Sequence, residues 1–316
     1  MTVLVGYLPE KDGRASLDLA AQIARSGTPE ALVVATVVPH PWSTPSMAKV
    51  DAEFVAWAQE QGAQALATAR EHLTRASPDV EVSFVPTSGR TVAKALLAAA
   101  ERAGADLLIL GSASGGPLGQ VMVGATAEPL LHSSPLPVTL APRGYRVQRT
   151  AFSRITCAFS GAEDSVDLLA ATAAWSSRLG VPLRVATFGV RGRTVYPSGV
   201  GFNAEDGVLA QWRQQSTRAQ ERALAELTTR GVLPSQVSAV IATGADWSQA
   251  LEGIDWQSGE VLVIGSSHEG PMARVFLGSR AIKIIRQSPV PVIVVPGAEV
   301  AQEVLGLGPP DASPAK

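Results

Sequence analysis

Two glycine-rich stretches, one in each half of the 316-residue chain, carry the residues best suited to chemistry. The first, 111–117, reads Gly-Ser-Ala-Ser-Gly-Gly-Pro, and the second, 265–271, reads Gly-Ser-Ser-His-Glu-Gly-Pro. Each follows an aliphatic run that is typical of a buried strand. Glycine lets backbone amides approach an anion, and a helix N-terminus adds unsatisfied N–H groups and a positive dipole end. The pattern therefore predicts a phosphate-binding loop in each half.

The two loops belong to a longer internal repeat. Gly124 is echoed by Gly278, and Ser-Pro-Leu-Pro-Val at 134–138 is echoed by Ser-Pro-Val-Pro-Val at 288–292. These matches and the two loops share one offset, which indicates a duplicated domain rather than chance. We predict domains at residues 1–144 and 152–298, followed by a flexible tail at 299–316.

Strand-like and helix-like segments alternate in both halves. We predict strands at 3–5, 32–38, 80–85, 105–110 and 138–140, and again at 155–158, 183–188, 237–241, 261–264 and 292–295. Helices are predicted at 12–24, 52–75, 91–103 and 121–131, and again at 164–178 and 206–230. Unbroken aliphatic runs indicate strands buried on both faces, and the alternation predicts α/β domains with five-stranded parallel sheets and helices on both faces. Trp57 and Trp212, on the two long helices, are expected to pack against the sheets.

The fifth predicted strands also suggest how the halves assemble. Both are short and apolar, at 138–140 and 292–295, and exposed apolar edges invite pairing. We expect them to join the halves as an intramolecular pseudo-dimer about a pseudo-twofold axis. A homodimer of the whole chain is a further alternative.

Composition excludes several functions. The net charge is −2 and no Lys/Arg run stands out, so neither nucleic acid nor an anionic membrane is predicted as a partner. No apolar stretch approaches the roughly 20 residues that span a bilayer. The single cysteine, Cys157, lies in an apolar run and is interpreted as a small core residue. His40, His72 and His132 appear isolated, so no metal site is predicted, and we expect a cytoplasmic protein.

The spacing within the loops resembles the ATP loop of the universal stress protein family. That pattern is a glycine, two residues, a second glycine, nine residues, and then Gly-Ser/Thr. The order of elements and the closing Ser-Pro-x-Pro-Val strand also resemble the family, over about residues 2–142 and 152–297. The resemblance implies two flavodoxin-like (Rossmann-like) domains.

The resemblance implies an ATP site in the second half, although neither copy of the motif is intact. There His268 replaces the second glycine, and Ser160 stands where the family's nucleotide binders carry an adenine-reading Asp. The candidate residues are Ser160, Phe188, Gly265, Ser266, His268, Arg274, Gly278 and Ser279. In the first half Ser114 replaces the second glycine, Ala125 replaces the hydroxyl residue, and Leu8 stands at the Asp position. Leu8 cannot accept a hydrogen bond, whereas Ser160 can.

Three functions follow from these residues. The leading hypothesis is a non-catalytic stress-response or regulatory module with a degenerate nucleotide site and an unknown regulatory partner. The alternative is an ATP-binding switch with its site in the second half and slow ATP hydrolysis. An enzyme of the wider adenine-nucleotide-hydrolase group is the weakest, because no base, nucleophile or metal set is visible.

Overall fold

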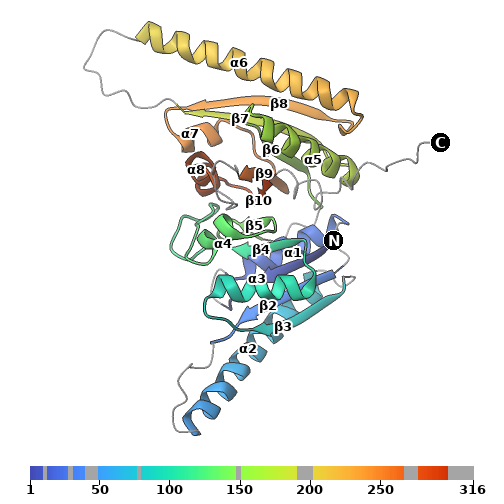
Figure 1. Cartoon of the computed structure of the whole chain (residues 1–316), viewed down its shortest axis with the longest axis vertical. Coiled ribbons are helices and arrows are strands. Elements are labelled where there is room, and N and C mark those ends of the chain that lie inside the picture. Colours follow the sequence, from blue (N-terminus) through green and yellow to red (C-terminus); the bar gives the residue numbers. More distant parts are fainter. Residues whose placement is uncertain are drawn as a thin grey trace, which may run out of the picture.

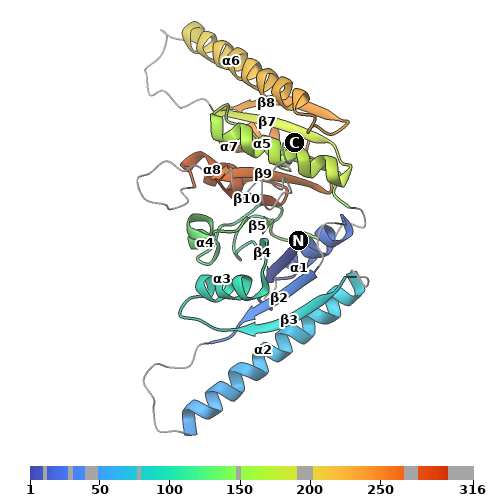
Figure 2. The same ribbon diagram turned by 45° about the vertical axis from the view of Figure 1, so that its right-hand side comes forward.

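The computed structural model describes residues 1–9, 13–27, 31–39, 49–76, 80–146, 151–190, 202–266 and 277–297. In these residues all strands form one sheet of ten, in the order β3-β2-β1-β4-β5-β10-β9-β6-β7-β8. The sheet runs along the long axis of the molecule, with α2 at one end and α6 at the other (Figures 1 and 2).

The first half folds as a five-stranded parallel sheet with the order β3-β2-β1-β4-β5. Its strands are β1 (Thr2–Gly6), β2 (Ala31–Val37), β3 (Val82–Thr87), β4 (Leu107–Gly111) and β5 (Val138–Ala141). Its helices are α1 (Arg14–Arg25), α2 (Lys49–Ala76), α3 (Val92–Ala103) and α4 (Ala127–Ser133). Helix α3 begins where the Thr91 hydroxyl accepts the Lys94 N–H, which satisfies one free amide of the first turn.

The second half repeats this plan with the order β10-β9-β6-β7-β8. Its strands are β6 (Arg154–Ala158), β7 (Leu183–Val190), β8 (Val237–Gly244), β9 (Glu260–Ser266) and β10 (Val292–Pro296). Its helices are α5 (Glu163–Leu179), α6 (Phe202–Thr229), α7 (Trp247–Glu252) and α8 (Ser279–Gln287). The predicted fold class is confirmed in both halves.

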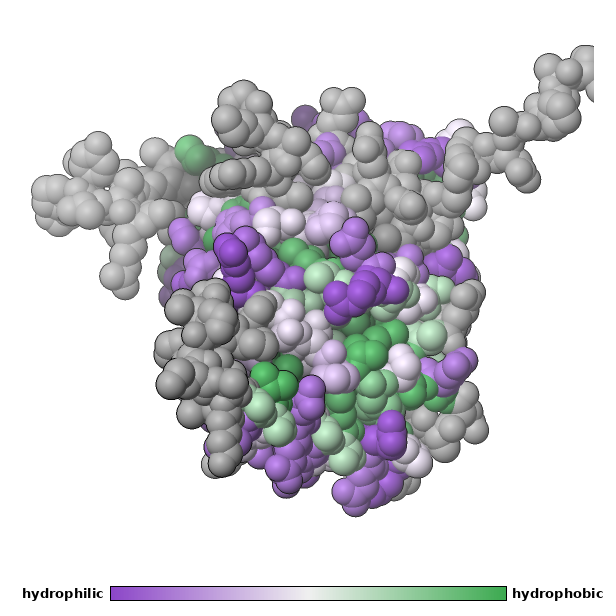
Figure 3. Space-filling model, turned by 60° about the horizontal axis from the view of Figure 1, so that its bottom comes forward, coloured by the Kyte–Doolittle hydropathy of each residue, from purple (hydrophilic) through white to green (hydrophobic). Residues whose placement is uncertain are grey.

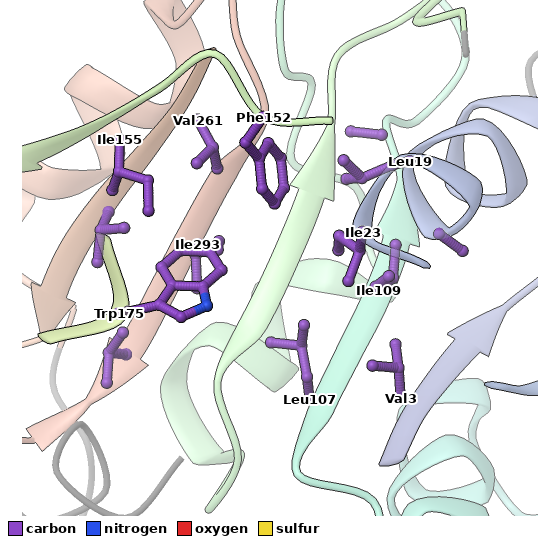
Figure 4. Packing of buried hydrophobic residues seen from close by; sticks show 14 of the residues in the cluster. Val3, Leu19, Ile23, Leu107, Ile109, Phe152, Ile155, Trp175, Val261 and Ile293 are labelled. Carbon is purple, nitrogen blue, oxygen red and sulfur yellow. The ribbon is translucent and has the colours of Figure 1, made fainter. Parts of the chain in front are cut away.

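The halves meet where β5 pairs antiparallel with β10, with Val138 opposite Val294 and Leu140 opposite Val292. The expected pairing of the fifth strands is therefore present within one chain. The core continues across this joint: one apolar cluster contains residues of α1, α2, α5 and α6, and a second contains residues of α3, α4, α7 and α8. These helices cover the two faces of the sheet. In the first cluster, Phe152 packs edge-on against Trp175, with the two ring centroids 5.8 Å apart (Figure 4).

Most boundaries shift by a few residues from the predictions, and α7 and α8 are not among the predicted helices. Two of the differences have a clear physical cause. The helix expected at 121–131 begins only at Ala127, because the Met122 N–H bonds to the Ser112 hydroxyl and the Met122 carbonyl accepts the Ala113 N–H. Strand β3 continues through Pro86, where we expected it to end. The Leu32 N–H donates to the Glu81 carbonyl, so alternation along the ladder turns the nitrogen of Pro86 away from β2. A proline is tolerated there because β3 is an edge strand.

The two tryptophans behave differently. Trp212 packs against β7: a Cβ added to Gly189 would lie 2.4 Å from its ring. The expectation for Trp57 is wrong, because its side chain is 50% exposed and stands beside Phe54. In the first half the small and large partners are exchanged, since Gly62 of α2 faces Val38 after β2. The larger side chain therefore belongs to the strand side in the first half (Val38) and to the helix in the second half (Trp212).

Candidate functional site

The candidate site lies at the carboxyl end of the second-half sheet, where ligands bind in open α/β sheets. The structure brings together the ends of the adjacent strands β6 and β9, which lead to Ser160 and Ser266. Phe188 lies near the end of the neighbouring strand β7. Gly278 caps α8 at its N-terminus, and Ser279 is its first residue. His268 and Arg274 lie outside the described residues, as does the proposed tail.

Equivalent hydrogen bonds form at the carboxyl ends of β1 and β6. The Thr36 hydroxyl donates to the Tyr7 carbonyl at 2.9 Å, and the Thr187 hydroxyl donates to the Phe159 carbonyl at 2.9 Å. The next residues, Leu8 and Ser160, therefore occupy corresponding positions. Both are exposed, but only Ser160 is polar. Its hydroxyl accepts the Ala162 N–H at 3.2 Å, which uses one of its two lone pairs.

The remaining described candidates divide into packed and open positions. Gly265 lies against α5, since an added Cβ would be 3.1 Å from Leu168. Ser266 is buried, and its hydroxyl donates to the Val295 carbonyl at 3.2 Å. Phe188 packs against a small apolar cluster of Ala186, Ala242 and Ile254. These three residues therefore pack or form hydrogen bonds within the protein at the carboxyl end of the sheet.

Gly278 is the open position. Its φ of −59° and ψ of 150° are accessible to other residues, and a Cβ there would meet no described atom within 4 Å. Neither backbone conformation nor packing in the described part of the chain requires glycine at this helix start. A glycine at a helix N-terminus leaves room for an anion to approach the amides.

The first-half loop, in contrast, is closed by its own hydrogen bonds. The Ala113 N–H donates to the Met122 carbonyl at 3.0 Å, and the Met122 N–H donates to the Ser112 hydroxyl at 2.6 Å. Gly124 is packed tightly, because an added Cβ would lie 2.7 Å from the Ala113 Cβ. The loop turns at Gly115, whose φ is +98°, directly after Ser114. The Ala113 and Met122 amides are therefore engaged within the loop.

Arg143 holds this closed loop from the segment after β5. Its guanidinium donates to the Gly116 carbonyl, its N–H donates to the Gln120 carbonyl at 2.8 Å, and its carbonyl accepts the Gly119 N–H at 2.9 Å. Sequence reasoning missed this role. No local pattern connects Arg143 with a loop that lies more than 20 residues earlier in the chain.

Other ionisable groups serve the core. Burial raises the pKa of the Cys157 thiol to about 12, although a hydrogen bond with Thr172 opposes the shift. This agrees with its interpretation as a core residue. His72 was expected to be isolated, but its Nε2 lies 2.7 Å from the buried carboxylate of Asp18.

Among the described residues, no group of three His, Cys, Asp or Glu side chains could hold a metal ion. No described helix is long and apolar enough to cross a membrane.

The fold and its repeat define a protein of two α/β domains whose strands form one sheet. The model of the universal stress protein family matches residues 1–142 and again residues 151–296, so the chain belongs to this family. It is 44% identical over 297 residues to the universal stress proteins Rv2319c of Mycobacterium tuberculosis (strain ATCC 25618 / H37Rv) and Mb2346c of Mycobacterium bovis. Each match covers 94% of this chain and 100% of the relative.

Solved structures support the fold alone. A universal stress protein from Archaeoglobus fulgidus DSM 4304 superposes with a TM-score of 0.63 and 18% identity, covering 93% of this chain and 97% of that one. A putative universal stress protein from Pseudomonas aeruginosa UCBPP-PA14 superposes with a TM-score of 0.56 and 16% identity. That comparison covers 97% of this chain and 96% of the other. Both comparisons span the two halves, so the tandem arrangement is shared.

Proposed function

We propose that this universal stress protein is a non-catalytic regulatory module whose first domain (1–144) has lost nucleotide binding. A degenerate site remains in the second domain (152–298). The observation that carries the proposal is the closure of the first-half loop. The Ala113 and Met122 amides are bonded within it, and Gly124 faces Ala113. An anion would have to replace these hydrogen bonds and separate the packed residues before it could bind.

A second candidate function, an ATP-dependent switch, is favoured by Gly278. This glycine leaves the start of α8 open among the described residues, and Ser160 offers a hydroxyl at the strand exit. Replacement of a carboxylate acceptor by a hydroxyl removes a charge-assisted hydrogen bond of about 1.5–3 kcal/mol. This loss corresponds to an affinity roughly 10- to 150-fold weaker, so ATP would bind the second domain weakly.

Hydrogen exchange of the full chain, with and without millimolar MgATP, tests the proposal. We expect slower exchange in peptides covering Gly265 and α8, and unchanged exchange in residues 111–126. Protection confined to residues 111–126 would contradict the assignment to the second domain. Phosphate release above that of a heat-inactivated sample would contradict the non-catalytic role and favour the switch with slow hydrolysis.

A further inference from the structure

The beginning of α2 presents a tryptophan to the outside of the molecule. The side of α2 that packs into the first apolar cluster is formed by Ala65, Leu66, Ala69 and Leu73. With about 3.6 residues per turn, Trp57 points away from that side, and its side chain is 50% exposed. This end of α2 projects past the sheet, and neither ribbon view shows another described helix or strand beside it (Figures 1 and 2). Tryptophan is enriched at the centres of protein interfaces, so this side chain marks a candidate contact surface.

Two carboxylates and a second aromatic ring lie beside Trp57. Glu53 comes four residues before it and Glu60 three residues after it, so both side chains share its side of the helix, and both are exposed. The Phe54 ring centroid lies 5.9 Å from that of Trp57. These four residues are called the Trp57 face below. Figure 3 looks at this end of the molecule, where hydrophobic side chains lie among hydrophilic ones.

The Trp57 face carries charge of one sign. The sequence contains no lysine or arginine between residues 52 and 69. The described ion pairs of α2, His72 with Asp18 and Arg75 with Glu71, lie near its other end. Among the described residues, neither carboxylate of the face has an ion-pair partner. Such a surface repels nucleic acids and anionic membranes and attracts a basic segment.

The second half shows how such groups bind an arginine. The Arg184 guanidinium lies 4.9 Å from the centroid of the Trp256 ring and pairs with the Glu260 carboxylate. The ring attracts the cation through its quadrupole, and the carboxylate accepts charge-assisted hydrogen bonds from the same group. The Trp57 face combines the same two kinds of side chain, and no guanidinium of the described chain lies over its ring.

We propose that the Trp57 face binds a basic segment of a partner protein. An arginine of that segment stacks on Trp57 and pairs with Glu53 or Glu60, and an apolar neighbour contacts Phe54. From Glu53 to the exposed Gln64 the surface extends roughly 17 Å along α2, which accommodates about five extended residues. This inference rests on the proposed regulatory function, which requires a partner, but not on nucleotide binding.

Fluorescence anisotropy with the full chain tests the proposal. The probe is a short fluorescein-labelled peptide of alternating arginine and leucine, at physiological salt and without nucleotide. Trp57→Ala should weaken its binding at least tenfold, about 1.4 kcal/mol, whereas Trp57→Phe keeps an aromatic face and should weaken it less. Glu53→Gln combined with Glu60→Gln should also weaken it at least tenfold. The matched control, Glu71→Gln with Glu81→Gln, removes two exposed carboxylates outside the face and should leave the affinity unchanged.

Charge reversal keeps the test valid if Trp57→Ala fails to fold. Glu53→Arg with Glu60→Arg should abolish binding of the arginine peptide and create binding of a glutamate–leucine peptide. The proposal is overturned if the unchanged chain does not bind the arginine peptide, or if the Trp57→Ala and glutamine variants bind it equally well. Self-association of the chain that Trp57→Ala removes would assign the face to a second copy and also overturn it. Protection by MgATP is measured separately, so a failure here leaves the nucleotide assignment standing.

Discussion

In the first half, the glycine-rich loop after β4 bonds to itself and to Arg143, whereas in the second half a Cβ on Gly278, at the start of α8, would contact no described residue. Both glycines of the pair, Gly124 and Gly278, occupy the same place in the repeat. In the first copy the missing side chain allows close packing against Ala113, and in the second no described residue packs against it. The comparison teaches that a retained glycine can have two different physical causes, and that a motif alone does not distinguish them.

The amino ends of the two sheets differ as well. In the second half the fully buried Glu260 pairs with Arg154 at 2.7 Å and with Arg184, and it accepts a hydrogen bond from Thr156. Burial lowers the pKa of the Arg184 guanidinium, and the neighbouring Glu260 opposes this shift. At the corresponding place of the first half, the Asp106 carboxylate accepts a hydrogen bond from the Thr2 N–H at 2.7 Å.

The largest predicted effect is at Glu260. Glu260→Ala should reduce the free energy of unfolding by about 3–5 kcal/mol, because it leaves the buried Arg184 and the partly buried Arg154 without their carboxylate. Asp106→Ala removes one hydrogen bond and should reduce it by about 1 kcal/mol. Urea unfolding of both variants measures the difference. Equal losses would show that the two amino ends are energetically alike.

The next effect concerns the exchanged packing of the long helices. Gly189→Val should destabilise the protein by about 1–3 kcal/mol through overpacking, since Trp212 fills the space a side chain needs. Adding Trp212→Ala should recover part of the loss, because it removes the ring that clashes. If the loss of unfolding free energy in the double variant exceeds the sum of the losses in the two single variants, the direct contact is not the cause.

A smaller effect separates the two loop glycines. Gly124→Ala should reduce stability by about 1–3 kcal/mol, because the new Cβ meets Ala113. Gly278→Ala should reduce it by less than about 1 kcal/mol, as expected for a changed helix cap. Thermal unfolding of the two variants compares these values. A larger loss for Gly278→Ala would mean that this glycine, too, is retained for packing.

Cys157 gives the smallest effect at neutral pH, because its contribution changes only at high pH. Its pKa in the folded protein is about 12, against an ordinary value of 9.0. Between these values the unfolded chain loses the thiol proton while the folded chain keeps it, so the free energy of unfolding falls as pH rises. Below pH 9 this contribution is constant. We expect no labelling by a thiol reagent at pH 8 without denaturant, and rapid labelling of the native protein would contradict the burial.

The sequence predicts the repeat, the alternation of strands and helices, and the pairing of the fifth strands because aliphatic runs and glycine spacing are local signals. It does not predict contacts between distant polar residues. Arg143 closes the loop at Gly116, and His72 meets Asp18 54 positions away. The prediction for Trp57 is wrong because helix α2 begins beyond the end of the sheet, as Figure 2 shows. Helical periodicity does not reveal where the neighbouring sheet stops.

Calorimetric titration of MgATP into two matched repair variants of the full chain tests the central claim most directly. The second-half variant combines Ser160→Asp with His268→Gly, and the first-half variant combines Leu8→Asp with Ser114→Gly. We predict at least tenfold tighter binding for the second-half variant, about 1.4 kcal/mol, since it restores the hydrogen-bond acceptor and the loop glycine of the family's motif. The first-half variant should show no gain, because the Ala113 and Met122 amides stay bonded within the loop. Tighter binding by the first-half variant alone would contradict this account.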